Sequence, residues 1–279
     1  MKLCRIRTAD GVRPAIIDAN GAARDLSKHL TDLDAAHIAP AALDHLSRLT
    51  LDDLPVVSGD YAPILADVRR LLCIGLNYTD HAIEAGMEIP KSPVMFCKFC
   101  EATGADDPIT IPKGGHQTDW EVELGIVIGS EAHHVSAAKA MDHVAGYCVM
   151  NDVTERSFQF TNGGQWARGK SCDGFAPVGP WLVTKDDIPD PQKLDIYCEV
   201  NGRRVQSGNT NTMIFSAAEI VAYISQTITL KPGDLIATGT PPGVGMGMKP
   251  PLYLKPGDVM HLGIEGLGTQ TQKLLAFSG

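Results

Sequence analysis

The clearest alternation of polar and apolar residues runs from Thr118 to Gly129, where acidic residues alternate with large apolar ones before an apolar end. A period of two predicts a β-strand, because successive side chains of a strand point to opposite faces. We therefore expect Asp119, Glu121 and Glu123 on one face of this strand, with the intervening apolar residues packed on the other. No Lys or Arg is interspersed among these acids. Carboxylates on one face repel each other unless a cation lies between them.

A second apolar run, Gly146 to Val153, also has the character of a strand and places Asp152 just past its apolar part. Two Glu from one strand and one Asp from another would form an all-oxygen site. Hard divalent cations prefer such ligands, and Mg²⁺ or Mn²⁺ is favoured when water or substrate completes the octahedron. The alternative is an exposed strand face whose acids are simply solvated.

A third pattern predicts a buried strand over 71–76, followed by a short helix within 77–86 that Asn77 or Thr79 could cap and Gly86 could end. His81 and Glu84 are three residues apart, so they are neighbours on one helix face. A carboxylate beside an imidazole orients the ring, as in a general base that takes a proton from water. The alternative is an ordinary surface ion pair.

Two loops add candidate polar groups. The segment 154–159 reads as a helical turn, and the glycine-rich loop 163–171 carries Lys170, which could stabilise an anionic substrate or be a solvated loop residue. The stretch 237–245 is too rich in Gly and Pro for regular structure, so its backbone N–H groups and the Thr240 hydroxyl could bind a carboxylate. It is no phosphate-binding P-loop, because no Gly-Lys-Ser/Thr follows.

The rest of the pattern predicts how the chain is divided into domains and elements. The pattern predicts a small N-terminal domain over residues 1–68, with strands at 3–7 and 14–18 and a partly helical remainder. It predicts a larger domain over residues 69–279. Apolar periodicity predicts one amphipathic helix over 213–226. The repeated sequence Leu-Lys-Pro-Gly-Asp at 230–234 and 254–258 predicts two type II turns, which we interpret as hairpin entries.

Composition and charge indicate which partners, cellular location and cysteine chemistry to expect. The 279 residues carry a net charge of −9 without a Lys/Arg run, so nucleic acid is an unexpected partner. No apolar run is long enough to span a membrane, and the N-terminus lacks the apolar stretch of a signal peptide. Seven scattered Cys suggest reduced thiols and a cytoplasmic location. Cys97 and Cys100 form a lone C-x-x-C without the second pair that zinc sites need, which favours a packing role over redox or zinc binding.

Taken in order, five motifs resemble the fumarylacetoacetate hydrolase family over residues 70–276. They are Gly75-Leu76-Asn77-Tyr78-x-x-His81-x-x-Glu84, Asp119-Trp120-Glu121-Val122-Glu123-Leu124, Asn151-Asp152-Val153, Gly169-Lys170-Ser171 and Thr238-Gly239-Thr240-Pro241-x-Gly243-Val244-Gly245. The resemblance implies an α+β, mostly β fold, a mixed β-roll with few helices, and a homodimer.

The same resemblance implies roles for individual residues. Glu121, Glu123 and Asp152 would hold Mg²⁺ or Mn²⁺, and His81 with Glu84 would activate water on a lid that orders over the substrate. Lys170 would stabilise developing charge, and Thr240 would meet the substrate carboxylate. The other residues implied to contact the substrate are Tyr78, Gln159, Trp166 and Gly239.

Within the family, the N-terminal unit, the loop around Trp166 and the stretch 249–251 are similar to one branch. That branch contains bacterial 2,4-diketo-3-deoxy sugar acid hydrolases of L-rhamnonate and L-fuconate breakdown, often labelled ureidoglycolate lyase. The resemblance implies metal-dependent cleavage of the C3–C4 bond to pyruvate and lactate. Alternatives are acylpyruvate hydrolysis, oxaloacetate decarboxylation, hydration or isomerisation of dienoic acids, and a silent metal-dependent binding module. His81 and Glu84 favour a hydrolase over an isomerase.

Overall fold

A large twisted sheet forms the centre of the computed structural model, which describes residues 1–84, 86–161 and 163–278. It has ten strands, and β4 (Asp60–Tyr61) pairs with β1 beside the main path. The other strands follow in the order β3 (Ala23–Asp25), β2 (Gly11–Ile17), β1 (Lys2–Thr8), β12 (Val178–Thr184), β10 (Val144–Asn151), β9 (Val122–Ile128), β15 (Asp234–Ala237), β5 (Arg70–Gly75) and β6 (Val94–Lys98).

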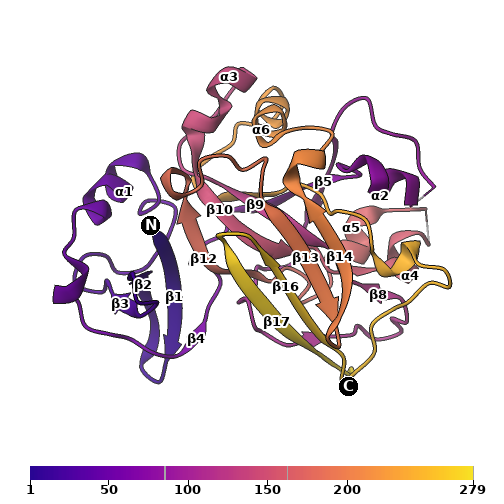
Figure 1. Cartoon of the computed structure of the whole chain (residues 1–279), viewed down its shortest axis with the longest axis horizontal. Coiled ribbons are helices and arrows are strands. Elements are labelled where there is room, and N and C mark those ends of the chain that lie inside the picture. The colour runs from indigo at the N-terminus through magenta and orange to yellow at the C-terminus, as the bar shows by residue number, and fades with distance from the viewer. Residues whose placement is uncertain (85, 162, 279) are drawn as a thin grey trace.

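A second sheet of five strands lies in front of the central strands in Figure 1. Its order is β14 (Arg203–Asn209), β13 (Asp195–Val200), β16 (Val259–Ile264), β17 (Gly268–Leu275) and β7 (Ile109–Thr110). The short strands β8 (Thr118–Asp119) and β11 (Thr154–Glu155) form a separate pair. Strands β9 and β10 are buried along their whole length, because apolar layers cover both faces of the large sheet.

Helices are short and lie around the sheets. They are α1 (Pro40–Ser47), α2 (Thr79–Glu84), α3 (Ala137–Ala140), α4 (Arg156–Gln159), α5 (Trp166–Lys170) and α6 (Ala217–Ser225), with 3₁₀ turns at Leu51–Asp53, Met141–His143, Lys185–Asp187, Thr210–Thr212 and Gly245–Gly247. None of the helices in the described residues is long and apolar enough to cross a membrane. The prediction of an α+β, mostly β protein with mixed sheets is confirmed.

The N-terminal strands extend the large sheet. They lie where predicted, and β1 pairs antiparallel with β12 of the main body. One apolar core joins the two parts, since Leu3 and Ile16 share it with Met150 and Leu235. In Figure 1 this unit lies on the left, whereas α2, α4 and α5 gather on the right. The division at residue 68 stays a prediction.

The predicted continuous strand 118–129 is wrong in one respect, because it breaks at Trp120 and Glu121. The first piece, β8, pairs with β11, and the second, β9, pairs with β10 and β15. The break is fixed by long-range contacts. The backbone N–H of Glu121 donates to the Asn151 side chain at 3.1 Å, and the indole of Trp120 donates to the Gly243 carbonyl at 3.0 Å.

Two other local predictions need correction. The helix predicted over 213–226 begins only at Ala217, because Ser216 and Glu219 form a capping box there. Both Leu-Lys-Pro-Gly-Asp turns form with a positive φ at Gly233 and Gly257. The first is not a hairpin entry, since the strand that follows it, β15, pairs parallel with β5 and antiparallel with β9.

Candidate active site

Three buried carboxylates meet where β9 and β10 lie side by side. Glu121 directly precedes β9, Glu123 lies within it, and Asp152 follows β10. The antiparallel register places Met150 opposite Glu123, and the Asp152 backbone N–H donates to the Glu121 carbonyl at 2.9 Å. One oxygen from each carboxylate lies within 4.8 Å of the others, which is compact enough for one metal ion. This group was predicted from sequence.

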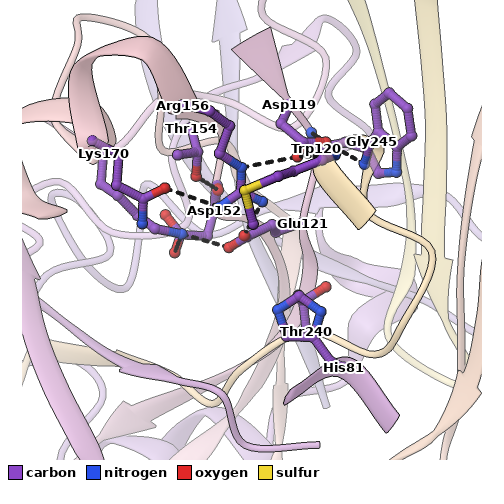
Figure 2. Close-up of polar contacts among 12 residues, drawn as sticks. His81, Asp119, Trp120, Glu121, Asp152, Thr154, Arg156, Lys170, Thr240 and Gly245 are labelled. Carbon is purple, nitrogen blue, oxygen red and sulfur yellow. Dashed lines mark hydrogen bonds and ion pairs between the residues drawn. The ribbon is translucent and has the colours of Figure 1, made fainter. Parts of the chain in front are cut away.

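Cationic side chains also reach this group, so the expectation of carboxylates without an intervening cation is wrong. The Lys170 ammonium donates to Glu121 at 2.5 Å and to Asp152 at 2.7 Å. Lys98, at the end of β6, donates to the other oxygen of Asp152, and Arg156 donates to the other oxygen of Glu121 at 2.6 Å. Dashed lines in Figure 2 mark such contacts of Arg156 and Lys170.

The two Glu residues differ in their surroundings. Burial alone would raise the pKa of Glu121, but the charges of Lys170, Arg156 and His81 outweigh it and lower the pKa to about 2. Burial, reinforced by the charges of Asp152 and Glu121, holds the pKa of Glu123 well above its ordinary value. Its recorded hydrogen bond comes from the backbone N–H of Gly239, at 2.7 Å. Among the described residues, Glu123 thus has no close cationic partner of the kind that the other two carboxylates have.

The donor set therefore fits a hard divalent cation. Three carboxylates offer only oxygen ligands, which Mg²⁺ and Mn²⁺ prefer. A buried carboxylate without a cationic partner is costly in free energy, and a dication at this point would stabilise the ionised form of Glu123. Glu121, Glu123 and Asp152 are the residues that would hold it.

Asp119 belongs to a different part of the site than predicted. Because the strand breaks after it, its carboxylate accepts from Arg156 at 2.9 Å and from the backbone N–H groups of Gly245 and Met246 at 2.7 and 3.0 Å. It thereby joins the first turn of α4 to the glycine-rich loop (Figure 2). Burial raises the pKa of Asp119, against the lowering effect of the Arg156 charge.

The predicted His81–Glu84 pair is present, and His81 lines the same cavity, whereas Glu84 is not among the described residues that line it. The imidazole is buried, and its Nδ1 lies 3.5 Å from Glu84 Oε2. Both oxygens of Glu84 accept the backbone N–H of Gly243 at 3.0 Å. Figure 2 shows His81 beside Thr240, across from the group that contains Glu121 and Lys170.

The start of α2 is fixed differently than expected. Asn77 was a candidate helix cap, but its side chain donates to the carbonyls of Phe215 and Thr238 and accepts from the Phe215 N–H. The next residue, Tyr78, is fully buried, and its hydroxyl has no hydrogen-bond partner among the described residues. Tyr78 is not among the described residues that line the cavity, and its contact with substrate stays a prediction.

The glycine-rich loop 237–245 contributes through its backbone as well as its side chains. The contact of the Thr240 hydroxyl with a substrate carboxylate stays a prediction, and without ligand this hydroxyl is paired within the protein. That hydroxyl donates to the Val122 carbonyl and accepts from Gln206, both at 2.8 Å. Gly239 holds Glu123 rather than lining the cavity. Thr240 still forms part of the cavity wall.

The loop predicted over 163–171 is partly helical, because Trp166–Lys170 forms α5. This short helix directs Lys170 at the carboxylates and places Trp166 in the cavity wall, with its ring 5.6 Å from that of Phe96. Gln159, at the end of α4, lines the same cavity and accepts from Arg156 at 3.1 Å.

One cavity brings most of these residues together. Its lining comprises Ile74, Gly75, Leu76, His81, Met87, Phe96, Glu121, Glu123, Asp152, Arg156, Gln159, Phe160, Trp166, Lys170, Thr240 and Met246. The cavity has a volume of about 410 Å³, including open solvent at its mouth. Sequence reasoning missed Arg156 and Lys98, since neither has a local signal that links it to the distant carboxylates.

Comparison with known proteins gives a family match over the part of the chain that contains the cavity residues. The family model described as "Fumarylacetoacetate (FAA) hydrolase C-terminal" matches residues 70–275. A Burkholderia ambifaria protein that carries the provisional name of hydrolase is 53% identical over 276 residues, with 98% of each chain covered.

Solved structures show the same fold. The fumarylacetoacetate hydrolase of Exiguobacterium antarcticum superposes with a TM-score of 0.88 at 35% identity, covering 99% of this chain and all of the other. A 2-hydroxyhepta-2,4-diene-1,7-dioate isomerase from Mycobacterium marinum gives 0.75 at 37% identity with both chains fully covered. Maleylpyruvate hydrolase from Sphingobium gives 0.82 at 26% identity, with 99% and 100% covered.

Proposed function

The chain belongs to the fumarylacetoacetate hydrolase family, and we propose that it hydrolyses the C3–C4 bond of a 2,4-diketo-3-deoxy sugar acid of the L-rhamnonate or L-fuconate type, giving pyruvate and lactate. The observation that carries this proposal is that a candidate metal site and a candidate general base line the same cavity. A buried three-carboxylate group lines the cavity, and so does His81, which is paired with Glu84.

Each group of site residues has its own role in the proposed reaction. A divalent cation held by Glu121, Glu123 and Asp152 would supply a Lewis acid for the carboxylate and C2 keto oxygens of the substrate. His81 takes a proton from water, whose oxygen attacks the C4 carbonyl carbon. The C3–C4 bond then breaks, and its electron pair stays on the pyruvate fragment as an enolate, which is protonated at C3. The buried ammonium of Lys170 stabilises the developing negative charge.

Lys170 suits this role because its ammonium group keeps its positive charge. Burial alone would lower the pKa of its ammonium, but Asp152 and Glu121 outweigh burial and raise it. The side chain therefore stays protonated near neutral pH. A fixed charge inside a buried cavity stabilises an anion more strongly than one in water does.

A coupled assay for pyruvate tests the proposal. The purified protein with Mg²⁺ or Mn²⁺ is mixed with 2,4-diketo-3-deoxy-L-rhamnonate, which is the same compound as its L-fuconate counterpart because C5 is the one stereocentre left, and with acetylpyruvate and oxaloacetate. The proposal expects stoichiometric pyruvate and lactate from the sugar acid. Turnover of oxaloacetate alone would replace it by a decarboxylase, and the absence of any product would favour a silent binding module.

A second candidate is isomerisation or another reaction that needs only an enolate, since three similar structures are named isomerases. The His81–Glu84 pair favours hydrolysis, because attack by water needs a base and enolate formation does not need one at this position. Acylpyruvate hydrolysis uses the same steps as the proposed reaction and differs from it only in the group beyond C4.

A further inference from the structure

We infer that Gly247 is a positioning residue for the His81–Glu84 pair, because the missing side chain at this position leaves the space in which Glu84 reaches the backbone N–H of Gly243. This inference rests on the proposed function in one respect, since it takes His81 as the base for water. Gly247 lies outside the five motifs of the family resemblance, and it is not among the described residues that line the cavity. Its effect on the reaction would therefore pass through Glu84.

The Glu84 side chain lies directly against Gly247. A Cβ at this glycine would be 2.3 Å from Cγ of Glu84, 2.4 Å from Cδ and 2.9 Å from Oε1. Carbon atoms that are not bonded to each other are in favourable contact at about 3.5–4.0 Å, so these distances are far too short. An alanine at position 247 and the present conformation of Glu84 are therefore incompatible.

The backbone of Gly247 does not itself require glycine. Gly243 does, because its φ is +103°, and at Gly245 a Cβ would lie 1.9 Å from the carbonyl oxygen of Leu252. Gly247 is not among the described glycines with a positive φ, and the three atoms nearest to a Cβ there all belong to Glu84. The contact with Glu84 is thus the steric reason for glycine at this position.

The turn over 243–247 is held in place by contacts on other sides. Asp119 accepts the N–H groups of Gly245 and Met246 at 2.7 and 3.0 Å, and Figure 2 shows Asp119 beside Gly245. The N–H of Leu252 donates to the Gly245 carbonyl at 2.9 Å. These hydrogen bonds are buried or partly buried, and breaking them would leave polar groups without partners. The turn is therefore unlikely to give way to an added methyl group at position 247.

The helix side of the contact is the weaker one. Glu84 is the last residue of the six-residue helix α2, and its side chain is partly exposed. The neighbouring Ile83 is 64% exposed, so little packing holds this end of the helix. A methyl group at position 247 would thus displace Glu84. Its oxygens would lose the Gly243 N–H, and the imidazole of His81 would lose the carboxylate that orients it.

A displaced Glu84 would affect the chemical step more than binding. Glu84 and Gly247 are both absent from the described lining of the cavity, so neither is placed to contact the substrate. His81 lines the cavity and would remain there with a less well-defined orientation. A misplacement of about 1 Å at a reacting group can cost about 10²-fold in rate. Loss of an interaction that acts in the transition state lowers kcat and leaves KM nearly unchanged.

The first test observes the contact itself and needs no substrate. In protein labelled with ¹⁵N-glycine, the Gly243 amide reports its hydrogen bond to Glu84 through its chemical shift and its exchange rate with solvent. We expect Gly247→Ala to move the Gly243 signal upfield and to speed its exchange by about tenfold or more. Glu84→Ala should do the same. The Gly245 amide, which is bonded to Asp119, is the internal control and should keep its shift.

Two results of this test would overturn the inference. An unchanged Gly243 signal in Gly247→Ala would show that Glu84 keeps its place beside an added methyl group. A Gly245 signal that moves together with that of Gly243 would show that the turn, and not Glu84, is displaced.

The second test is a double-mutant cycle in pyruvate release from the sugar acid. Gly247→Ala should lower kcat by about 10- to 100-fold with little change in KM. In the Glu84→Ala background the same substitution should have almost no further effect, because residues in contact are not additive. Oxaloacetate decarboxylation should fall much less than hydrolysis in each variant.

Equal losses from Gly247→Ala in both backgrounds would show that Gly247 acts independently of Glu84 and would overturn the inference. A rise in KM at unchanged kcat would overturn it too, since it would assign Gly247 to substrate binding. If the wild type releases pyruvate from no diketo acid, the proposed function fails instead. The Gly243 amide still decides in that case whether Gly247 positions Glu84.

Discussion

Glu84 is held more firmly by the glycine-rich loop than by His81. Both of its carboxylate oxygens accept the Gly243 N–H at 3.0 Å, whereas His81 Nδ1 lies 3.5 Å away, at the outer limit of a hydrogen bond. The carboxylate is therefore fixed in space before it contacts the imidazole. Contacts of this kind often tighten only when a substrate is bound.

Removal of the imidazole should separate hydrolysis from other enolate reactions. His81→Ala should lower C–C hydrolysis by roughly 10²–10⁴-fold, the usual contribution of a positioned general base. Oxaloacetate decarboxylation should fall much less, because Lys170 and the three carboxylates are unchanged. The measurement is the ratio of the two rates in wild type and variant. A loss of the same factor in both would assign His81 a structural role.

Glu84→Gln is the matched control for this pair. The amide still accepts the Gly243 N–H through its oxygen but no longer favours a protonated ring. Hydrolysis should fall, and by less than in His81→Ala, with decarboxylation again retained. A larger loss than in His81→Ala would contradict the assignment of Glu84 as the residue that orients the ring.

Metal binding should stabilise the fold as well as support turnover. In the described part of the chain Glu123 has no close cationic partner, so a dication that binds there would stabilise its ionised form, which burial disfavours. We expect Mg²⁺ or Mn²⁺ to raise the Tm in a concentration-dependent manner, by the general effect of a ligand that binds the native state alone. EDTA should abolish turnover, and added metal should restore it.

Glu123→Gln is the diagnostic variant for this site. It should remove most of the metal-dependent rise in Tm while leaving the Tm without metal equal or higher. Glu121→Gln should also weaken metal binding, but it leaves Arg156 and Lys170 short of a partner and should lower the metal-free Tm. Full activity of the wild type after exhaustive chelation would contradict the prediction.

Asp119 should be important for stability because it connects two elements at the cavity. Asp119→Ala removes a buried partner of Arg156 and frees two loop N–H groups, and breaking such a pair costs about 3–5 kcal/mol. Urea unfolding measures the loss. Asp142→Ala, which removes an exposed pair with Lys139, is the control and should change stability by less than about 1 kcal/mol. Similar losses in both would refute this assignment.

The sequence predicts those site residues whose pattern is contained in a short stretch of the chain. Glu121 and Glu123 follow from alternation within a strand, and His81 and Glu84 follow from helical spacing. Asp152 follows from an acid that lies just past the apolar part of a strand. The positions of all five depend on residues close to them in the chain, and the sheet then brings the segments together.

The other contacts depend on pairings that the pattern does not contain. Lys98 is 54 residues before Asp152, and nothing near Lys98 distinguishes it from a solvated strand end. The alternation through Asp119 continues without interruption, yet the chain changes pairing partner after it, from β11 to β10. The capping residues Ser216 and Glu219 did carry a local signal, the S-x-x-E spacing, which was overlooked within a longer apolar pattern.

That capping box gives a prediction of pH dependence. The Ser216 side chain and backbone N–H bond to Glu219 and lower its pKa below the ordinary 4.5. A lowered folded pKa means that the stabilisation is present above the unfolded pKa and is lost as the pH falls through the folded one. Ser216→Ala should therefore cost about 0.5–2 kcal/mol at pH 7 and less near pH 3. Urea midpoints at several pH values measure this, with Ser207→Ala as an exposed control.

The last prediction concerns the mobility of α2. This helix has six residues, and its start is fixed by Asn77 while Glu84 is tied to Gly243. Ile83 is 64% exposed, so the outer face of the helix has little packing to hold it. Passage of a substrate into a cavity of this size requires the wall to open, and α2 carries the wall residue His81. We expect fast amide exchange over 79–84 without ligand and slower exchange with Mg²⁺ and oxalate. The buried strand β9 should exchange slowly in both states. Equal protection of 79–84 with and without oxalate would show that this helix is not the element that opens.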